Sequence, residues 1–196
     1  MAHHHIHHTE GIILSHRARG EANKMLSIYT LEYGLVYAQA QGIRLNKSKL
    51  RFALQDLSYA KIDLVRGRDV WRVTSATPIN SFAYARTDMG SIALMLRVSK
   101  LIERLCNGEE GNRDVFADII QSFMVLDSES VAVETREALE LHLVLRILNQ
   151  LGYIGDNKDL VNYLDGGFES EKAKEVLFNK KSIVMAINQA LRESQL

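Results

Sequence analysis

Residues 41–57 contain four positively charged side chains within eight positions, which are Arg44, Lys47, Lys49 and Arg51. No acidic residue lies among them, so the four charges repel one another and gain little from packing. An external polyanion relieves this repulsion, and the phosphate backbone of a nucleic acid is the commonest one. The alternative interpretation is an ordinary solvent-exposed loop. We therefore regard this stretch as a candidate nucleic-acid contact.

Positive charge is concentrated in the first part of the chain. The 196 residues have no net charge, but residues 1–78 carry 11 lysines and arginines against 6 acidic residues, whereas residues 79–196 carry 13 against 18. Such segregation is typical of a nucleic-acid-binding module joined to a module with another role. Arg72 is one of the cations of the first part. The residues predicted to bind nucleic acid are Arg17, Arg19, Lys24, Arg44, Lys47, Lys49, Arg51, Arg66 and Arg68.

Aromatic residues accompany these cations and offer faces on which bases stack. They are Tyr29, Tyr33, Tyr37, Tyr59 and Trp71. The alternative is that they fill the core of the domain, and for Trp71 we favour the core.

Residue types that perform catalysis are not grouped in this sequence. Ser15 and His16 are adjacent in or beside a strand, so their side chains point to opposite faces and cannot act as nucleophile and base. His142 lies in a very apolar stretch, which favours a buried core histidine. Cys106 is the single cysteine, so neither an internal disulfide nor a cysteine zinc site is expected. We expect no enzymatic activity, no metal and no cofactor.

Composition indicates a folded protein, and the single cysteine, Cys106, indicates a reducing compartment, the cytoplasm. Hydrophobic residues make up 46% and charged residues 24% of the chain, as in ordinary globular proteins. No apolar run reaches the roughly 18 residues that cross a bilayer, so no membrane association is expected. The histidine-rich residues 3–8 are interpreted as an expression tag or a frayed terminus and are excluded from the candidate site.

The elements that position the cations are predicted to be strands. Short apolar runs alternate with turn residues about every ten positions up to residue 77, which is typical of a small β-barrel. The expected strands are residues 11–15, 25–30, 35–41, 54–65 and 70–75. Five strands fit an OB-type barrel, whose faces and loops commonly bind single-stranded nucleic acid. An SH3-like barrel is the alternative.

Beyond Pro78, the only proline, the hydrophobic period changes to that of helices. A helix capped by Asn80 or Ser81 is expected to end near residues 107–108, and a second carries Phe116 to Phe123. The stretch 130–151 is apolar on nearly all sides and predicts the central helix of a bundle. Further helices are expected at residues 157–164 and 170–191. The prediction is an α+β chain with two domains, a five-stranded OB-type β-barrel at residues 9–78 and an all-α helical domain at residues 79–196.

The order and spacing of several residues resemble the RecO family of bacterial recombination mediators. The resemblance spans most of the chain and includes a Leu-Gly-Tyr signal after the long helix. The matching residues are Glu21, Thr30, Gly34, Gly42, Arg44, Lys47, Ser48, Leu54, Gln55, Leu151, Gly152 and Tyr153.

This resemblance implies an OB barrel followed by a helical domain without a catalytic site. It implies binding of single- and double-stranded DNA, annealing of complementary strands, and loading of the RecA recombinase on DNA coated by single-stranded DNA-binding protein, together with RecR. The expected location is the cytoplasm, at the nucleoid. A protein-interaction adaptor that works through its helical domain, and an RNA-binding barrel, are the alternatives.

Two departures from the family pattern bear on the helical domain. Many relatives carry a cysteine-based zinc site there, which Cys106 alone cannot form. Relatives also carry arginines before the Leu-Gly-Tyr signal that bind the acidic tail of single-stranded DNA-binding protein. Here that region reads Leu141-His142-Leu143 between Arg136 and Arg146, and no tail-binding residue is assigned.

Overall fold

The computed structural model describes residues 5–106, 108–128, 131–155, 160–164, 166–168 and 170–194. Contacts between residues divide the chain into two compact units. The barrel unit consists of residues 1–83 together with residues 99–113. The helical unit consists of residues 84–98 and 114–196.

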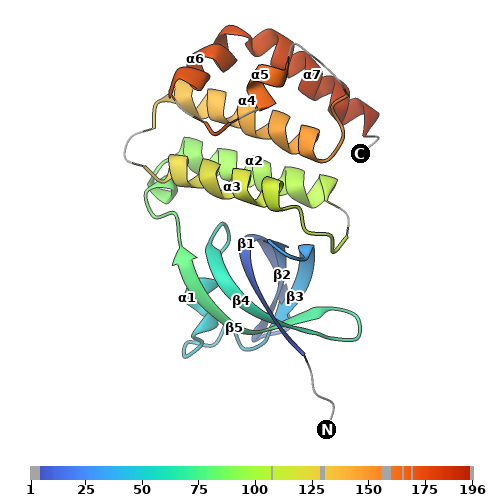
Figure 1. The fold of residues 1–196 in the computed structure, drawn as a ribbon. Helices are drawn as coiled ribbons and strands as arrows, with labels where there is room; N and C mark the ends of the chain where they lie inside the picture. The colour runs from blue at the N-terminus through green and yellow to red at the C-terminus, as the bar shows by residue number, and fades with distance from the viewer. Residues whose placement is uncertain are drawn as a thin grey trace. The chain divides into compact units, whose positions relative to one another are not determined.

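Five strands form the barrel, shown in blue to green in Figure 1. They are β1 (Ile6–Arg19), β2 (Asn23–Thr30), β3 (Gly34–Ala40), β4 (Tyr59–Arg66) and β5 (Trp71–Asn80). They close in the order β1-β2-β3-β5-β4, with β3 and β5 parallel and the other pairs antiparallel. A short helix, α1 (Leu50–Ala53), connects β3 to β4. The predicted α+β class with an OB-type barrel is confirmed, and the SH3-like alternative is excluded.

The barrel closes because alternate residues of its strands are apolar. In β3, Val36, Ala38 and Ala40 are buried in the core, while Tyr37 between them is exposed. Residues two apart on a strand share a face, so the three apolar side chains meet those of the other strands inside the barrel. The fold thus separates an apolar interior from a polar outer face.

The predicted strand over residues 54–65 is wrong in its first part. Residues 54–58 form a turn that follows α1, and β4 begins only at Tyr59. Leu57 has a positive φ of 61°, and the Ser58 hydroxyl donates hydrogen bonds to the carbonyls of Ala53 and Gln55. These bonds turn the chain, while the Leu57 amide and the Ser58 carbonyl are already hydrogen-bonded to the backbone of Ile13 in β1.

The interpretation of the histidine-rich start as a frayed terminus is also wrong for residues 6–8. They belong to β1 and pair with β4, Ile6 lying opposite Val65. His8 Nδ1 lies 2.6 Å from a carboxylate oxygen of Asp63. Residues 3 and 4 lie outside the described residues.

Pro78 lies within β5, opposite Ala60, and the strand continues to Asn80. The helix predicted to be capped by Asn80 or Ser81 begins only at Met89. Asp88 caps it, accepting a 2.7 Å hydrogen bond from the Ser91 amide, and hydrogen bonds from Ser91 lower the pKa of this carboxyl. The domain division at residue 78 stays a prediction, whereas contacts first divide the chain after Ala83.

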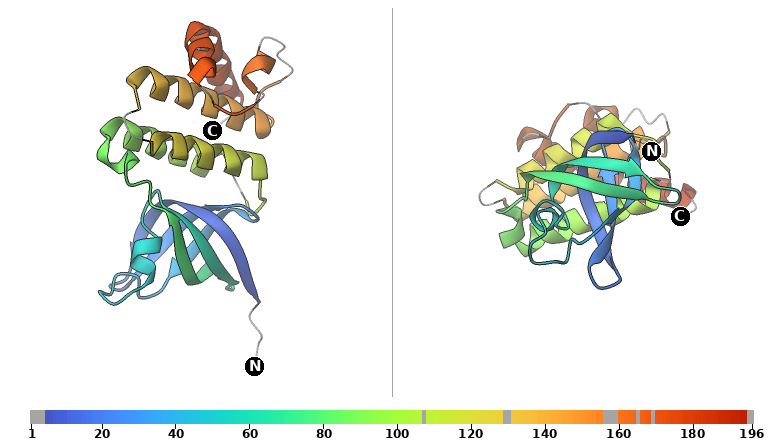
Figure 2. Two further views of the ribbon diagram at one scale, coloured as in Figure 1. Left: turned by 60° about the vertical axis from the view of Figure 1, so that its left-hand side comes forward. Right: turned by 90° about the horizontal axis from the view of Figure 1, so that it is seen from below.

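The helical unit is built around its longest helix. It contains the 3₁₀ turn η1 (Ala85–Thr87), the first part of α2 (Met89–Leu105), and α3 (Arg113–Leu126), α4 (Val133–Gln150), α5 (Val161–Leu164), α6 (Ser170–Phe178) and α7 (Lys180–Glu193). α4 contacts α5, α6 and α7, as Figures 1 and 2 show. The prediction of a central helix in this region is confirmed. Every helix among the described residues is too short or too polar to cross a bilayer.

Two polar side chains of α4 lie inside the helical unit. Arg146 forms a salt bridge with Asp118 of α3 at 2.7 Å and donates hydrogen bonds to the carbonyls of Leu164 and Gly166. His142 is buried, as predicted, and burial, together with the nearby Arg146 charge, lowers its pKa to about 4. The imidazole is therefore neutral at neutral pH.

Candidate nucleic-acid interface

The β1–β2 hairpin and the loop after β3 form one continuous surface. The Gly42 amide donates a 2.9 Å hydrogen bond to the Asn23 side chain, and the Arg44 amide donates one of 3.0 Å to the Ala22 carbonyl. The Arg44 guanidinium donates to the Gly20 carbonyl at 3.1 Å. Gly42 has a positive φ of 65°, a conformation that favours glycine. The loop is therefore ordered by the hairpin, which is seen in dark blue in the right-hand view of Figure 2.

Three of the predicted residues surround a hollow at this end of the barrel. The cationic hollow is lined by Lys24, Ile43, Arg44, Arg51, Leu54 and Gln55 and has a volume of about 310 Å³. Ile43 and Leu54 are buried and supply apolar surface, while the three cations and Gln55 supply the polar groups. A phosphate or a sugar-phosphate fits this combination, because cations attract the anionic group and the apolar surface excludes water.

The other cations near this end are exposed. Lys47 and Lys49 lie in the loop, and Arg17 and Arg19 lie on β1. Among the residues that the structure describes, none of these four, nor Lys24, Arg44 or Arg51, forms a salt bridge with a carboxylate. Asp56, which follows the loop, lies 2.5 Å from Nδ1 of His16. The positive charge of this surface is thus uncompensated within the described chain.

Arg66 and Arg68 do not line the cationic hollow. Arg66 forms a salt bridge with Glu109 at 2.7 Å and lies 5.2 Å from the centre of the Trp71 ring. The Trp71 indole also donates a 2.9 Å hydrogen bond to Glu109. Arg68 is exposed in the β4–β5 turn. The charge of Arg66 is therefore balanced locally, which the sequence did not indicate because Glu109 is 43 positions away.

Of the five aromatic candidates, only Tyr37 presents an open face. It is 52% exposed, whereas Tyr29, Tyr59 and Trp71 are buried and Tyr33 is half-buried against Trp71. Trp71 belongs to the core, as predicted. Stacking by the buried rings is excluded, and Tyr37 remains as a base-stacking candidate.

A second hollow of about 360 Å³ lies beside Tyr37 on the outside of the barrel. We call it the outer-face hollow. Its lining residues are Ser15, His16, Arg17, Met25, Leu26, Ser27, Tyr37 and Glu103. Glu103 comes from the part of α2 that belongs to the barrel unit. Sequence reasoning missed Glu103 and Ser27, since neither stands in a recognisable pattern.

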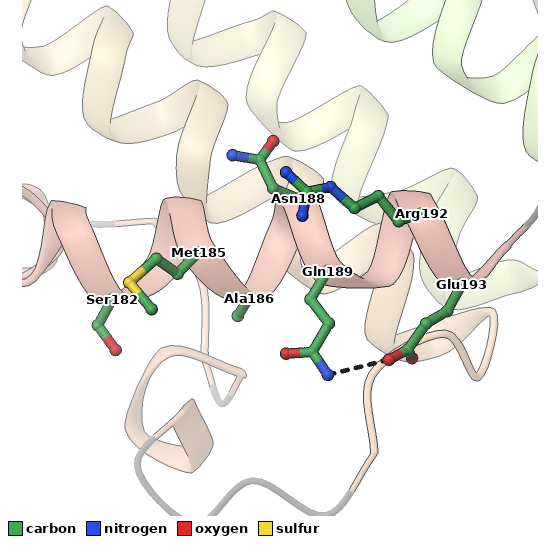
Figure 3. Close-up of a pocket in the computed structure, with 7 residues that line it drawn as sticks. All are labelled: Ser182, Met185, Ala186, Asn188, Gln189, Arg192 and Glu193. Carbon is green, nitrogen blue, oxygen red and sulfur yellow. Dashed lines mark hydrogen bonds between the residues drawn. The ribbon is translucent and has the colours of Figure 1, made fainter.

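The helical unit has its own surface hollow along α7, shown in Figure 3. It has a volume of about 550 Å³ and is lined by Ser182, Met185, Ala186, Asn188, Gln189, Arg192 and Glu193. Met185 is 64% exposed, and the Gln189 amide donates a 2.9 Å hydrogen bond to Glu193. This mixed polar and apolar surface is a candidate binding surface for the alternative function, a protein-interaction adaptor.

Fold and surface together define the class, an α+β protein whose OB-type barrel carries uncompensated positive charge and is joined to a helical unit. Residues 1–82 match the family model "Recombination protein O N terminal", and relatives named DNA repair protein RecO match most of the chain. These matches support the RecO family for this chain.

Three relatives illustrate the extent of the similarity, and each is called DNA repair protein RecO. The protein of Heliobacterium modesticaldum is 28% identical over 76% of this chain, that of Alkaliphilus metalliredigens 30% over 69%, and that of Dehalococcoides mccartyi 29% over 79%. The chain covers 52%, 56% and 59% of these relatives, respectively. It therefore spans little more than half the length of the curated relatives it matches.

Proposed function

We propose that this chain takes part in DNA repair and recombination by binding single- and double-stranded DNA and annealing complementary strands. Assistance in loading the RecA recombinase follows from the same proposal, with RecR and single-stranded DNA-binding protein as further partners. The proposed place of action is the cytoplasm, at the nucleoid. The names of the relatives support this assignment, because each is called a DNA repair protein.

The observation that carries the proposal is the uncompensated cationic surface formed by the β1–β2 hairpin and the 41–51 loop. Lysines and arginines without carboxylate partners displace the counterions condensed on DNA phosphates, and the release of these counterions drives sequence-independent binding. Two strands bound to such a surface repel each other less, so base pairing between them proceeds. The chemistry consists of binding and charge screening, and no catalytic step is required.

A strand-annealing assay at 50 mM and 200 mM salt tests the proposal with the variant Lys47→Glu, Lys49→Glu, Arg51→Glu. Reversal of three charges should abolish annealing, and the wild-type protein should anneal much more slowly at the higher salt. A matched control reverses three exposed cations of the helical unit, Lys174, Lys181 and Arg192, and should anneal like the wild type. Wild-type annealing by the loop variant would refute the assignment of the loop.

The α7 hollow supports a second candidate function, a protein-interaction adaptor. Met185 and Phe178 are 64% and 90% exposed in this part of the chain, and exposed apolar side chains of this size are common at protein interfaces. A pull-down that retains partners after reversal of the loop cations, combined with no DNA binding by the wild type at low salt, would favour the adaptor. DNA binding by the wild type that the loop variant loses would favour the annealing function.

A further inference from the structure

The outer-face hollow is arranged in two rows of side chains across the sheet. Ser15 of β1 lies opposite Ser27 of β2, which lies opposite Tyr37 of β3. Two residues further along each strand, Arg17 lies opposite Met25, which lies opposite Gln39. Because residues two apart share a face of a strand, both rows are on the same side of the sheet. The second row continues to β5, where Arg72 lies opposite Gln39.

Some of the hydrogen-bonding groups that line this hollow can still bond to a ligand. Ser27 is only 5% exposed, and its hydroxyl has no hydrogen-bond partner among the described residues. Buried hydroxyls are normally paired, so an unpaired one beside a hollow points to a ligand. Ser15 donates a 2.6 Å hydrogen bond to Oε1 of Glu103. A carboxylate accepts several hydrogen bonds, so Glu103 retains capacity for a donor from a ligand.

We propose that the outer-face hollow binds one unpaired nucleobase, a proposal that rests on the DNA-binding function above. The base stacks on the exposed ring of Tyr37, and its polar edge meets Ser27 and Glu103. Arg17 on one side and Arg72 on the other contact the flanking phosphates. The volume of about 360 Å³ lies in the range of small-ligand pockets, roughly 300–1,000 Å³.

Two specificities follow from these groups. A carboxylate accepts a hydrogen bond from an exocyclic amino group, which cytosine, adenine and guanine possess and thymine lacks. Cytosine should therefore gain more from Glu103 than thymine does. A paired base cannot enter the hollow, so the same site favours single strands over duplexes.

Fluorescence anisotropy with two labelled 20-mers tests base binding in the outer-face hollow. One 20-mer consists of deoxycytidines, and the other is an abasic backbone of equal length. The wild type should bind the deoxycytidine 20-mer about 5- to 100-fold more tightly, from stacking of a single base. Tyr37→Leu should lose this advantage and keep its affinity for the abasic 20-mer, while Tyr37→Phe, which retains the ring, should keep it. Because Tyr37 is half exposed, neither variant should change the thermal midpoint.

The outcomes separate the two proposals. Failure of the wild type to bind either 20-mer at low salt would refute DNA binding itself. Two results would refute base binding in the outer-face hollow and leave DNA binding intact. The first is equal affinity of the wild type for the two 20-mers. The second is a Tyr37→Leu variant that still binds the deoxycytidine 20-mer more tightly than the abasic one, by the same factor as the wild type.

The hydrogen-bonding part has its own test with Glu103→Gln and Ser27→Ala. The ratio of affinities for oligodeoxycytidine and oligothymidine should fall in Glu103→Gln, because one carboxylate oxygen that accepts from the amino group is replaced by an NH₂ group that cannot accept. Ser27→Ala should weaken the binding of both oligonucleotides, because a hydroxyl bonds to either base. The Glu103→Gln side chain still accepts the bond from Ser15, which protects the fold. An unchanged ratio in Glu103→Gln would refute the role of Glu103, and unchanged affinities in Ser27→Ala would refute the role of Ser27.

Discussion

Neutralising the cations of the cationic hollow should make DNA affinity less dependent on salt concentration, by an amount that depends on how many of these cations contact phosphates. The variant Lys24→Gln, Arg44→Gln, Arg51→Gln removes three charges that surround one hollow of about 310 Å³. For single strands, each neutralised phosphate contributes about 0.7 to the slope of log affinity against log salt. If each cation meets one phosphate, the slope should become shallower by about 2. From 50 to 200 mM salt the wild type should then lose about 20-fold more affinity than the variant.

The measurement is a titration of a labelled single strand at several salt concentrations between 50 and 200 mM, followed by anisotropy. The control neutralises Lys174, Lys181 and Arg192 to glutamine and should leave the slope unchanged. Tryptophan fluorescence confirms folding of the barrel, because Trp71 is the only tryptophan and lies in the barrel core. A variant whose slope equals that of the wild type would show that phosphates do not contact the hollow.

Three further predictions concern stability. The pKa of His142 is about 4 in the folded chain and about 6.5 when unfolded, so the unfolded state binds the extra proton and the free energy of unfolding should fall by up to ~3 kcal/mol from pH 6.5 to 4. Urea titrations followed by far-UV circular dichroism should show a smaller fall in the His142→Leu variant than in the wild type. An equal fall in the two proteins would contradict this prediction. Gly34→Ala should lower the stability of the barrel by ~2 kcal/mol or more, because Gly34 has a φ of 58° and an added Cβ would lie 2.3 Å from the Glu110 carbonyl oxygen. Gly20→Ala, also at positive φ but with open space around it, should lower the free energy of unfolding by less, as measured by tryptophan fluorescence. Equal losses of stability in the two variants would refute the role of the close approach. Arg146→Met should cost ~3–5 kcal/mol by leaving a buried carboxylate unpaired, and a thermal midpoint like that of the wild type would refute it.

The barrel was predictable where its signal is local. Alternation of Val36, Ala38 and Ala40 with polar residues depends only on which side of the strand each residue faces. The turn before β4 was not predictable in this way, because residues 54–65 read as one long strand. What decides the turn is the Ser58 hydroxyl bonded to the Ala53 and Gln55 carbonyls, and a serine is also compatible with a strand.

The candidate site also has features that were predictable from local sequence and features that were not. Arg44 and Arg51 are neighbours in sequence and line one hollow with Lys24, so their charge density was visible in the sequence. The local neutralisation of Arg66 was not, because its partner Glu109 comes from a segment beyond the barrel strands. The selection of Tyr37 from five aromatic residues likewise depends on burial, which is decided by the closed barrel as a whole.

The return of residues 99–113 to the barrel unit has a consequence for biosynthesis. During translation, the five strands emerge before Glu103, Glu109 and Glu110, which supply the Ser15 bond, the Trp71 bond and the close contact with Gly34. Domains generally fold as units from the N-terminus, but here the nascent barrel must wait until residue 113 for its last segment. A fragment that stops at residue 83 would lack these contacts permanently. A fragment that keeps all three contacts therefore continues through residue 113, into what is otherwise the helical half of the sequence.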